Sequence, residues 1–232
     1  MHAYTVASCY KFITINEPEI LKIELLQAMK KHQILGTFIL ASEGLNAGFS
    51  GTSEDIQGMY AFLRTDTRFA DLEFKETYTD TIPFERRKVK LRPEIVTLGV
   101  PGTKALTTKE THLSPQAWDK LLEDPDVLVI DARNHYEVTL GKFRGAVDPE
   151  IDTFREFPEY VQKNLLDKKH QKIATYCTGG IRCEKSTAYF KDLGFEQVYQ
   201  LDGGILNYIK QIPEEKSKWD GHCFVFDERI AV

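Results

Sequence analysis

YCTGGIRCEK, residues 176–185, is the stretch that decides the fold of the second half of this 232-residue chain. The apolar run 172–176 leads into it, and the helix-like run 186–193 leads out of it. A cysteine at a strand end, followed by glycines and a helix, predicts an anion-binding loop, because the loop N–H groups and the helix N-terminus point inward. Such a setting lowers the pKa of a cysteine from about 8.5 to below about 7.5. Cys177 is therefore the predicted nucleophile and sulfur carrier.

The predicted active-site loop, called the cysteine loop below, comprises Cys177 and the six residues after it: Thr178, Gly179, Gly180, Ile181, Arg182 and Cys183. Arg182 is expected either to complete the anion site or to be an exposed cation at the helix start. Four residues separate it from Cys177, one fewer than a cysteine phosphatase needs to enclose a tetrahedral phosphate, and this favours sulfur chemistry. Cys183 has two interpretations: a cysteine that packs the helix, or a resolving thiol that attacks a persulfide or sulfenate on Cys177.

Strands alternate with helices around the cysteine loop, which predicts a doubly wound parallel sheet. Residues 126–133 form a nearly continuous apolar run, as in a strand buried on both faces. In such sheets the chemistry lies beyond the carboxyl ends of the strands. Asp131 and Arg133 lie at one such end, and we expect a structural ion pair or support for the anion site. Glu137 and the turn at residues 202–204 are assigned mainly structural roles.

The N-terminal part of the chain shows a different pattern. The predicted order is strand, helix, strand, strand, helix, strand, which is the ferredoxin-like arrangement; the segments are residues 4–15, 17–32, 37–41, 47–51, a helix from Ser53, and 72–79. In the first strand the larger apolar residues occupy even positions, and Cys9 is out of phase with them.

A basic segment, FERRKVKLR at residues 84–92, follows this pattern. Its cations are expected either to protect an edge strand from pairing or to contact the phosphates of a nucleic acid; they are Arg86, Arg87, Lys88, Lys90 and Arg92. The predicted domains are residues 1–92 (ferredoxin-like), a linker at 93–111, a doubly wound α/β domain at 112–218 and a C-terminal segment at 219–232. Residues 222–229 resemble a strand, and the chain is expected to be truncated there.

Composition narrows the class of protein. A net charge of −5 argues against wholesale nucleic-acid binding but permits a local basic patch. No apolar run approaches a membrane span and no signal peptide is recognisable, so we expect a cytoplasmic protein that does not bind a membrane. Four scattered cysteines predict free thiols rather than a disulfide scaffold. His222 and Cys223 are too few to bind zinc, and no metal or organic cofactor is predicted.

Seven segments together resemble the tRNA uridine(34) hydroxylase family, in which a rhodanese domain follows a ferredoxin-like one. They cover nearly the whole chain in the family's order: SEGLNAGFSG (42–51), VKLRPEIVTLG (89–99), VIDARNHYE (129–137), FRGAVDP (143–149), TFREFP (153–158), YCTGGIRCEKS (176–186) and LDGGILNYI (201–209). Family members usually continue into a cysteine-containing tail, which this chain lacks.

The resemblance implies conversion of the wobble uridine of tRNA to 5-hydroxyuridine, with molecular oxygen as co-substrate and Cys177 as the active cysteine, acting through a persulfide. It also implies a sulfur donor and tRNA as partners, and we expect the ferredoxin-like domain and residues 86–92 to hold the tRNA. The loop pattern alone is equally consistent with a simple sulfurtransferase that uses thiosulfate or a protein persulfide. A noncatalytic module and a cysteine phosphatase are disfavoured by the intact loop and by its spacing.

Overall fold

The computed structural model describes residues 2–106 and 109–232 and contains two units. The first comprises the chain up to Val96 together with Phe226–Arg229, and the second comprises Thr97–Val225 together with Ile230–Val232. The chain passes from one to the other within the segment expected to be a linker. Along the described residues, no helix is both long and apolar enough to cross a membrane.

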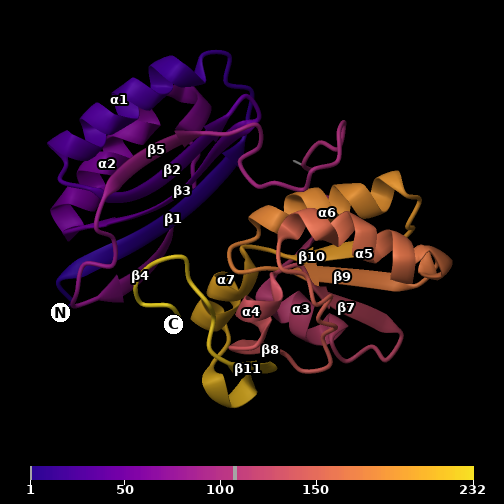
Figure 1. Cartoon of the computed structure of the whole chain (residues 1–232). Helices are drawn as coiled ribbons and strands as arrows, with labels where there is room; N and C mark the ends of the chain where they lie inside the picture. Colours follow the sequence, from indigo (N-terminus) through magenta and orange to yellow (C-terminus); the bar gives the residue numbers. More distant parts are fainter. Residues whose placement is uncertain (1, 107–108) are drawn as a thin grey trace. The chain divides into compact units, whose positions relative to one another are not determined.

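Two helices cover one face of a five-stranded sheet in the first unit (Figure 1). The elements are β1 (Tyr4–Phe12), α1 (Pro18–Lys31), β2 (Leu35–Ala41), β3 (Gly44–Gly51), α2 (Ser53–Thr65), β4 (Lys75–Thr79) and β5 (Arg87–Leu91), with a 3-10 turn at Thr67–Phe69. The strand order is β4-β1-β3-β2-β5, antiparallel except for the parallel pair of β2 and β5. The predicted ferredoxin-like arrangement is confirmed, with β5 added at an edge.

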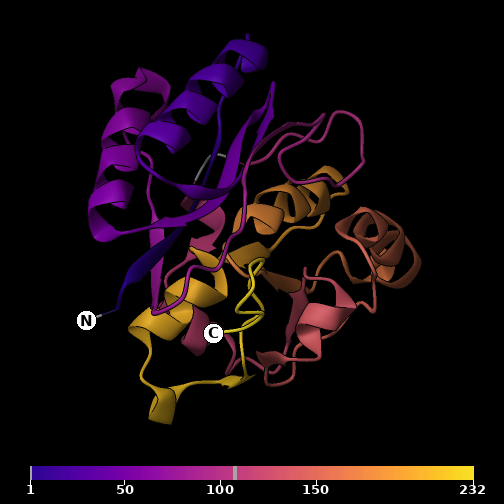
Figure 2. The same ribbon diagram turned by 60° about the vertical axis from the view of Figure 1, so that its left-hand side comes forward.

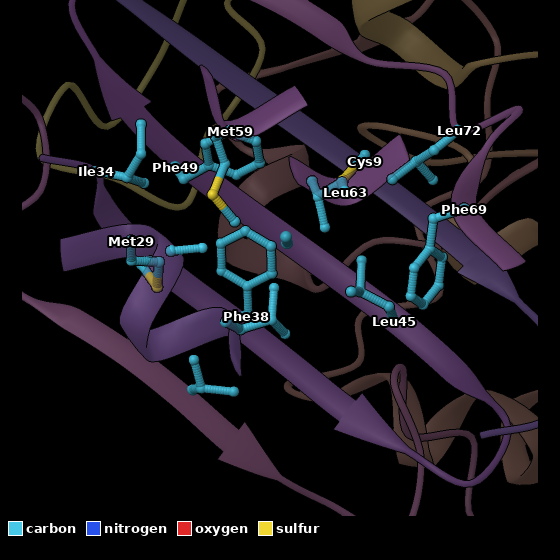
Figure 3. Close-up of a cluster of buried hydrophobic side chains, with 14 of the residues drawn as sticks. Cys9, Met29, Ile34, Phe38, Leu45, Phe49, Met59, Leu63, Phe69 and Leu72 are labelled. Carbon is cyan, nitrogen blue, oxygen red and sulfur yellow. The ribbon is translucent and has the colours of Figure 1, made fainter. Parts of the chain in front are cut away.

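The core of the first unit lies between this sheet and its two helices. Figure 3 shows Met29 of α1 and Met59 of α2 beside Phe38 and Phe49 of the sheet. On β1 it is the smaller set, Ala7 and Cys9, that faces the helices, while the larger even-numbered side chains lie on the opposite face. Large side chains reach the core from neighbouring strands and helices, so small residues fit on β1.

The basic segment forms the edge strand β5. Val89 is buried against the core, whereas Lys88 and Lys90 are exposed on the face without helices. Because β4 and β5 lie at opposite edges, residues 80–86 must cross the sheet, and Phe84 lies near Gly48 of the third strand.

The second unit is built on a four-stranded parallel sheet of order β6-β10-β9-β7. Its strands and helices are β6 (His112–Leu113), α3 (Pro115–Leu121), β7 (Val127–Asp131), α4 (His135–Val138), β8 (Gly141–Phe143), α5 (Phe157–Asn164), β9 (Lys172–Tyr176), α6 (Ile181–Asp192), β10 (Val198–Leu201), α7 (Gly204–Gln211) and β11 (Trp219–Gly221). Short 3-10 turns lie at Lys109–Thr111, Phe154–Glu156, Leu166–Lys168 and Glu214–Lys216. Strands β8 and β11 form a separate antiparallel pair.

Helices pack on both faces of the parallel sheet (Figure 2). On one face, Trp118 of α3 and Tyr208 of α7 join Tyr176 in an apolar cluster. On the other face, Phe157 of α5 packs edge-on against Phe190 of α6. The predicted α/β class, with a doubly wound parallel sheet in the second domain, is confirmed.

The C-terminal segment forms a narrow turn rather than the expected strand at residues 222–229. Cys223 and Val232 exchange backbone hydrogen bonds, and the chain reverses between them. The tip, Phe226–Arg229, belongs to the first unit. There Arg229 pairs with Asp227 and donates to Thr77 Oγ1 at 2.8 Å.

Candidate active site

The cysteine loop connects the end of β9 to the start of α6. Cys177 follows directly after the strand, and Gly180 precedes the helix with a left-handed φ of 98°. Ile181, Arg182 and Cys183 form the first helical turn. Since the helix N-terminus carries partial positive charge, this geometry favours an anion at the Cys177 sulfur.

Hydrogen-bond donors converge on the sulfur of Cys177. The Gly180 N–H lies 3.1 Å from Sγ, and the N–H groups of Arg182 and Cys183 and the Cys183 thiol also donate to it. Complete burial favours the neutral thiol, but these hydrogen bonds and the charge of Arg182 outweigh it and lower the pKa of Cys177 to about 6. A pKa of about 6 favours the thiolate form of Cys177 near neutral pH.

Cys183 has the opposite protonation preference. It is fully buried, and burial is the main reason why the pKa of Cys183 is raised well above its usual value. The hydrogen bond with Cys177 and the negative charge of Cys177 raise this pKa further. Its sulfur in turn accepts a hydrogen bond from the Thr175 hydroxyl on β9. The two sulfurs thus form a thiolate–thiol pair in which Cys183 keeps the proton.

Arg182 is held by a buried carboxylate. Its Nη1 and Nη2 donate to Glu137 Oε2 and Oε1 at 2.6 and 2.7 Å, and Glu137 is completely buried. Burial raises the pKa of Glu137, but the charge and hydrogen bonds of Arg182 outweigh it, so that the net shift is downward. Thr178 Oγ1 also donates to Glu137 at 3.3 Å. Arg182 is therefore a buried, oriented cation beside Cys177, not the exposed cation of the alternative interpretation.

Glu137 is a site residue to which the sequence analysis assigned a mainly structural role. It has that role too, since it accepts the Asn134 N–H at 3.1 Å in the capping box that starts α4. The spacing of Asn134 and Glu137 is the sequence signal for such a box. Nothing in the local sequence indicates the second contact, with Arg182 on a distant helix.

Gly204 is a second residue that sequence analysis missed. The N-terminus of α7 packs against the cysteine loop, where Ile205 N–H donates to the Cys177 carbonyl at 3.0 Å and Leu206 N–H to the Thr178 carbonyl at 3.1 Å. A Cβ on Gly204 would lie 2.4 Å from the Cys177 carbonyl oxygen, and φ at this position is +68°. Only glycine fits, because the backbone is left-handed and the loop is too close.

Asp131 and Arg133 form a completely buried ion pair at 2.6 Å. Arg133 also donates to the carbonyls of Glu137 and Gly141, at 3.2 and 2.7 Å, and its guanidinium lies 5.1 Å from the Trp219 ring. These contacts anchor the segment that carries Glu137, so Asp131 and Arg133 support the site indirectly.

The five predicted tRNA-binding cations lie in the first unit, all on exposed positions. Lys88 and Lys90 share one face of β5, on which Arg86 and Arg92 continue the alternation beyond the strand ends. Arg87 points to the other face, and its Nε donates to the Met29 carbonyl of α1 at 3.3 Å. The stripe of cations on the face without helices therefore has four members rather than five.

Within residues 2–106 and 109–232, no group of three or more His, Cys, Asp or Glu side chains is arranged to hold a metal ion. The four cysteines are free thiols. The chemistry that the described residues offer is that of a buried thiolate with an adjacent thiol and a fixed guanidinium.

Two family models match the chain. Residues 4–95 match the UPF0176 acylphosphatase like domain, and residues 114–211 match the Rhodanese-like domain. Proteins named tRNA uridine(34) hydroxylase from the Corby and Lens strains of Legionella pneumophila are each 55% identical to the chain over 227 residues, which is 98% of this chain and 89% of each relative. A solved rhodanese-like domain of the Alr3790 protein from Anabaena is 20% identical, with a TM-score of 0.40 over 48% of this chain and 80% of that one.

Proposed function

The chain belongs to the tRNA uridine(34) hydroxylase family, and from this premise we propose that it hydroxylates the wobble uridine of tRNA to 5-hydroxyuridine with molecular oxygen as co-substrate. The structural observation that carries the proposal is the Cys177 thiolate, which three backbone N–H groups and Arg182 stabilise in the rhodanese-like unit. A reactive cysteine in such surroundings is a catalytic group, not a packing residue.

The persulfide of Cys177 is the form in which we propose that the cysteine acts. A persulfide places a second, anionic sulfur beyond Sγ, and the loop N–H groups and the nearby guanidinium are donors suited to a single anionic atom. Glu137 fixes the guanidinium of Arg182 by two hydrogen bonds, so the donor stays oriented when the sulfur departs.

The tRNA is proposed to contact the stripe of cations along β5. Lys88 and Lys90 project from the same face of an edge strand and are exposed, as contacts to a phosphate backbone require. Strands place alternate residues about 7 Å apart, close to the spacing of successive phosphates along a nucleic-acid strand.

The test of the proposed function is nucleoside mass spectrometry of tRNA from cells that lack the gene and carry either the wild-type chain or a variant. Cys177→Ser removes the thiolate and is expected to abolish 5-hydroxyuridine. Cys9→Ala, which changes a cysteine in the core of the first unit, is the matched control and is expected to retain it. Normal levels of the nucleoside with Cys177→Ser would exclude the proposed role of this cysteine.

A second candidate is sulfur transfer without hydroxylation, and the match of residues 114–211 to the Rhodanese-like domain favours it. The same thiolate would accept sulfur from thiosulfate and pass it to cyanide or another thiol. Rapid turnover of thiosulfate without tRNA, together with unchanged 5-hydroxyuridine in cells that lack the gene, would select this alternative.

A further inference from the structure

We propose that Cys183 is the resolving thiol of the cysteine loop: once Cys177 carries a transferred atom, Cys183 attacks the Cys177 sulfur and closes a disulfide between the two. The inference rests on the proposed function of Cys177 as a sulfur carrier. It adds a second catalytic residue and a requirement that an external thiol reduce the protein after each such event.

The position of Cys183 carries the inference. Of the four cysteines, all within the described residues, Cys183 is the one that shares the cysteine loop with Cys177. The Gly180 N–H donates to Cys177 Sγ at 3.1 Å and the Cys183 N–H donates to the Gly180 carbonyl at 3.0 Å, so one turn of chain brings the two cysteines together, and the Cys183 thiol helps to stabilise the Cys177 thiolate. Cys9 lies in the core of the first unit, and Cys223 lies in the C-terminal segment, next to the carbonyl of Phe224. Both side chains are completely buried, Cys177 at the start of the loop and Cys183 in the first turn of α6, so a local rearrangement of the loop can bring their sulfurs to the ~2.05 Å length of a disulfide bond.

The surroundings of Cys183 set the time at which it reacts. Burial is the main cause of the raised pKa of Cys183. The hydrogen bond with the Cys177 thiolate and the negative charge of that thiolate raise this pKa further. When Cys177 acquires another atom, the negative charge leaves Sγ: it moves to the outer sulfur of a persulfide or is lost in a sulfenic acid. Both contributions then weaken. Cys183 is thus protected while Cys177 is a free thiolate and becomes more acidic after Cys177 has been modified.

The step balances without a further reagent. A persulfide at Cys177 and the thiol of Cys183 give the disulfide and one hydrogen sulfide: the bond from Cys177 Sγ to the outer sulfur breaks, the outer sulfur leaves with that electron pair, and the Cys183 proton goes to it. A sulfenic acid at Cys177 gives the disulfide and water in the same way. In each case the Cys183 sulfur is oxidised. The electron pair goes to the outer sulfur of the persulfide, which leaves as sulfide, or to the Cys177 sulfur of the sulfenic acid, whose oxygen leaves as water.

A structural alternative is that Cys183 only donates a hydrogen bond that keeps Cys177 ionised. Two variants separate these roles. Cys183→Ser keeps a hydroxyl donor but forms no disulfide, whereas Cys183→Ala removes both properties. We expect the pKa of Cys177 to stay low with Cys183→Ser and to rise with Cys183→Ala, while both variants lose the resolving reaction.

The experiment uses the full chain without tRNA. The reduced protein is treated anaerobically with inorganic polysulfide, freed of reagent, and followed by released sulfide and by peptide mass. Trypsin cleaves after Arg182, so the predicted disulfide joins peptide 173–182 to peptide 183–185. The wild-type protein is expected to yield this linked pair and one sulfide per persulfide. Cys183→Ser is expected to keep the extra sulfur on peptide 173–182.

A parallel arm uses hydrogen peroxide and a sulfenic-acid trap, and thereby distinguishes water from sulfide as the leaving group. Accumulation of trapped sulfenic acid with Cys183→Ser, but not with the wild-type chain, supports the inference. Cys223→Ser is the matched control and should behave as wild type. Sulfide release from Cys183→Ser at the wild-type rate, or a linked peptide that contains Cys223, would overturn the inference. These readouts need no tRNA, so they can be interpreted even if the nucleoside assay shows no role for Cys177 in hydroxylation. Likewise, the nucleoside assay can be interpreted even if no disulfide forms.

Discussion

Replacing Gly204 with alanine is expected to disable Cys177, although Gly204 lies outside the cysteine loop. The new Cβ would lie 2.4 Å from the Cys177 carbonyl oxygen and 2.7 Å from both Gly180 N and the Thr178 carbonyl oxygen, whereas ordinary contact begins at 3.4 Å. Relief of the closest contact requires a shift of 3.4 − 2.4 = 1.0 Å. All three obstacles are backbone atoms, so the loop itself must move.

The cost has two parts. An alanine with φ near +68° is strained by about 1–3 kcal/mol. Forcing a methyl group into a packed interior adds about 1–3 kcal/mol. The sum of roughly 2–6 kcal/mol corresponds to a fall in Tm of roughly 5–20 °C for a chain of this size. A shift of the loop also lengthens the 3.1 Å hydrogen bond from Gly180 N–H to Cys177 Sγ, so the pKa of Cys177 should rise toward its ordinary value.

Two measurements check this prediction: calorimetric unfolding, and a pH titration of the ultraviolet absorption of the Cys177 thiolate. Gly179→Ala is the control inside the loop. Its Cβ would meet no atom within 4 Å, and φ at Gly179 lies outside the left-handed region, so its Tm should be unchanged or slightly higher. If Gly204→Ala kept both the wild-type Tm and the low pKa of Cys177, the packing of α7 against the loop would not matter.

Three further predictions concern charges. The folded-state pKa of Cys177 is lowered to about 6, so its thiolate stabilises the folded protein at pH values above the ordinary thiol pKa. This stabilisation is lost as the pH falls from about 9 through about 6. Chemical denaturation over that pH range should show the loss in the wild-type chain but not in Cys177→Ser. Glu137→Gln removes the carboxylate that pairs with a buried guanidinium and should cost about 3–5 kcal/mol in the free energy of unfolding, measured by urea denaturation. Replacing Lys88 and Lys90 with alanine should weaken tRNA binding and reduce the salt slope by about 0.7–0.9 per lost phosphate contact, measured by titration at several salt concentrations, while Arg87→Ala should leave that slope unchanged.

Each of these has a result that would contradict it. For Cys177, it is an identical pH profile in the wild-type chain and the serine variant. For Glu137, it is a loss below about 1 kcal/mol, the value typical of an exposed pair. For the basic strand, it is a salt slope that responds to Arg87 as strongly as to Lys88.

The features that could be predicted well are those whose residues are contiguous in the sequence. The pattern of strand, cysteine, glycines and helix lies within about twenty residues around Cys177, and backbone physics translates it directly into an anion site. The partner of Arg182 could not be read in that way, because Glu137 is 45 residues away and its only local signal is a capping box. The need for glycine at position 204 likewise depends on a backbone that comes from β9.

In the first unit, the sequence predicted the order of strands and helices. It did not predict which face of β1 is buried or how β5 pairs. Periodicity identified β1 as a strand, but the size of its side chains does not indicate which face is buried, since the small residues Ala7 and Cys9 are the ones that face the helices. Segment 84–92 was recognised as basic and compatible with an edge strand. Its parallel pairing with β2 requires a crossing of the whole sheet, and such long-range pairing leaves no local pattern.

The return of Phe226–Arg229 to the first unit has a practical consequence for anyone who dissects the gene. A recombinant fragment that stops at residue 96 contains every strand and helix of that unit but lacks the hydrogen bonds of Arg229 to Thr77 and of Glu228 N–H to the Pro83 carbonyl. The end of the family match, at residue 95, is therefore a boundary of sequence similarity and not of the folded unit. A faithful fragment would be a fusion that joins residues 226–229 to the N-terminal segment through a designed linker.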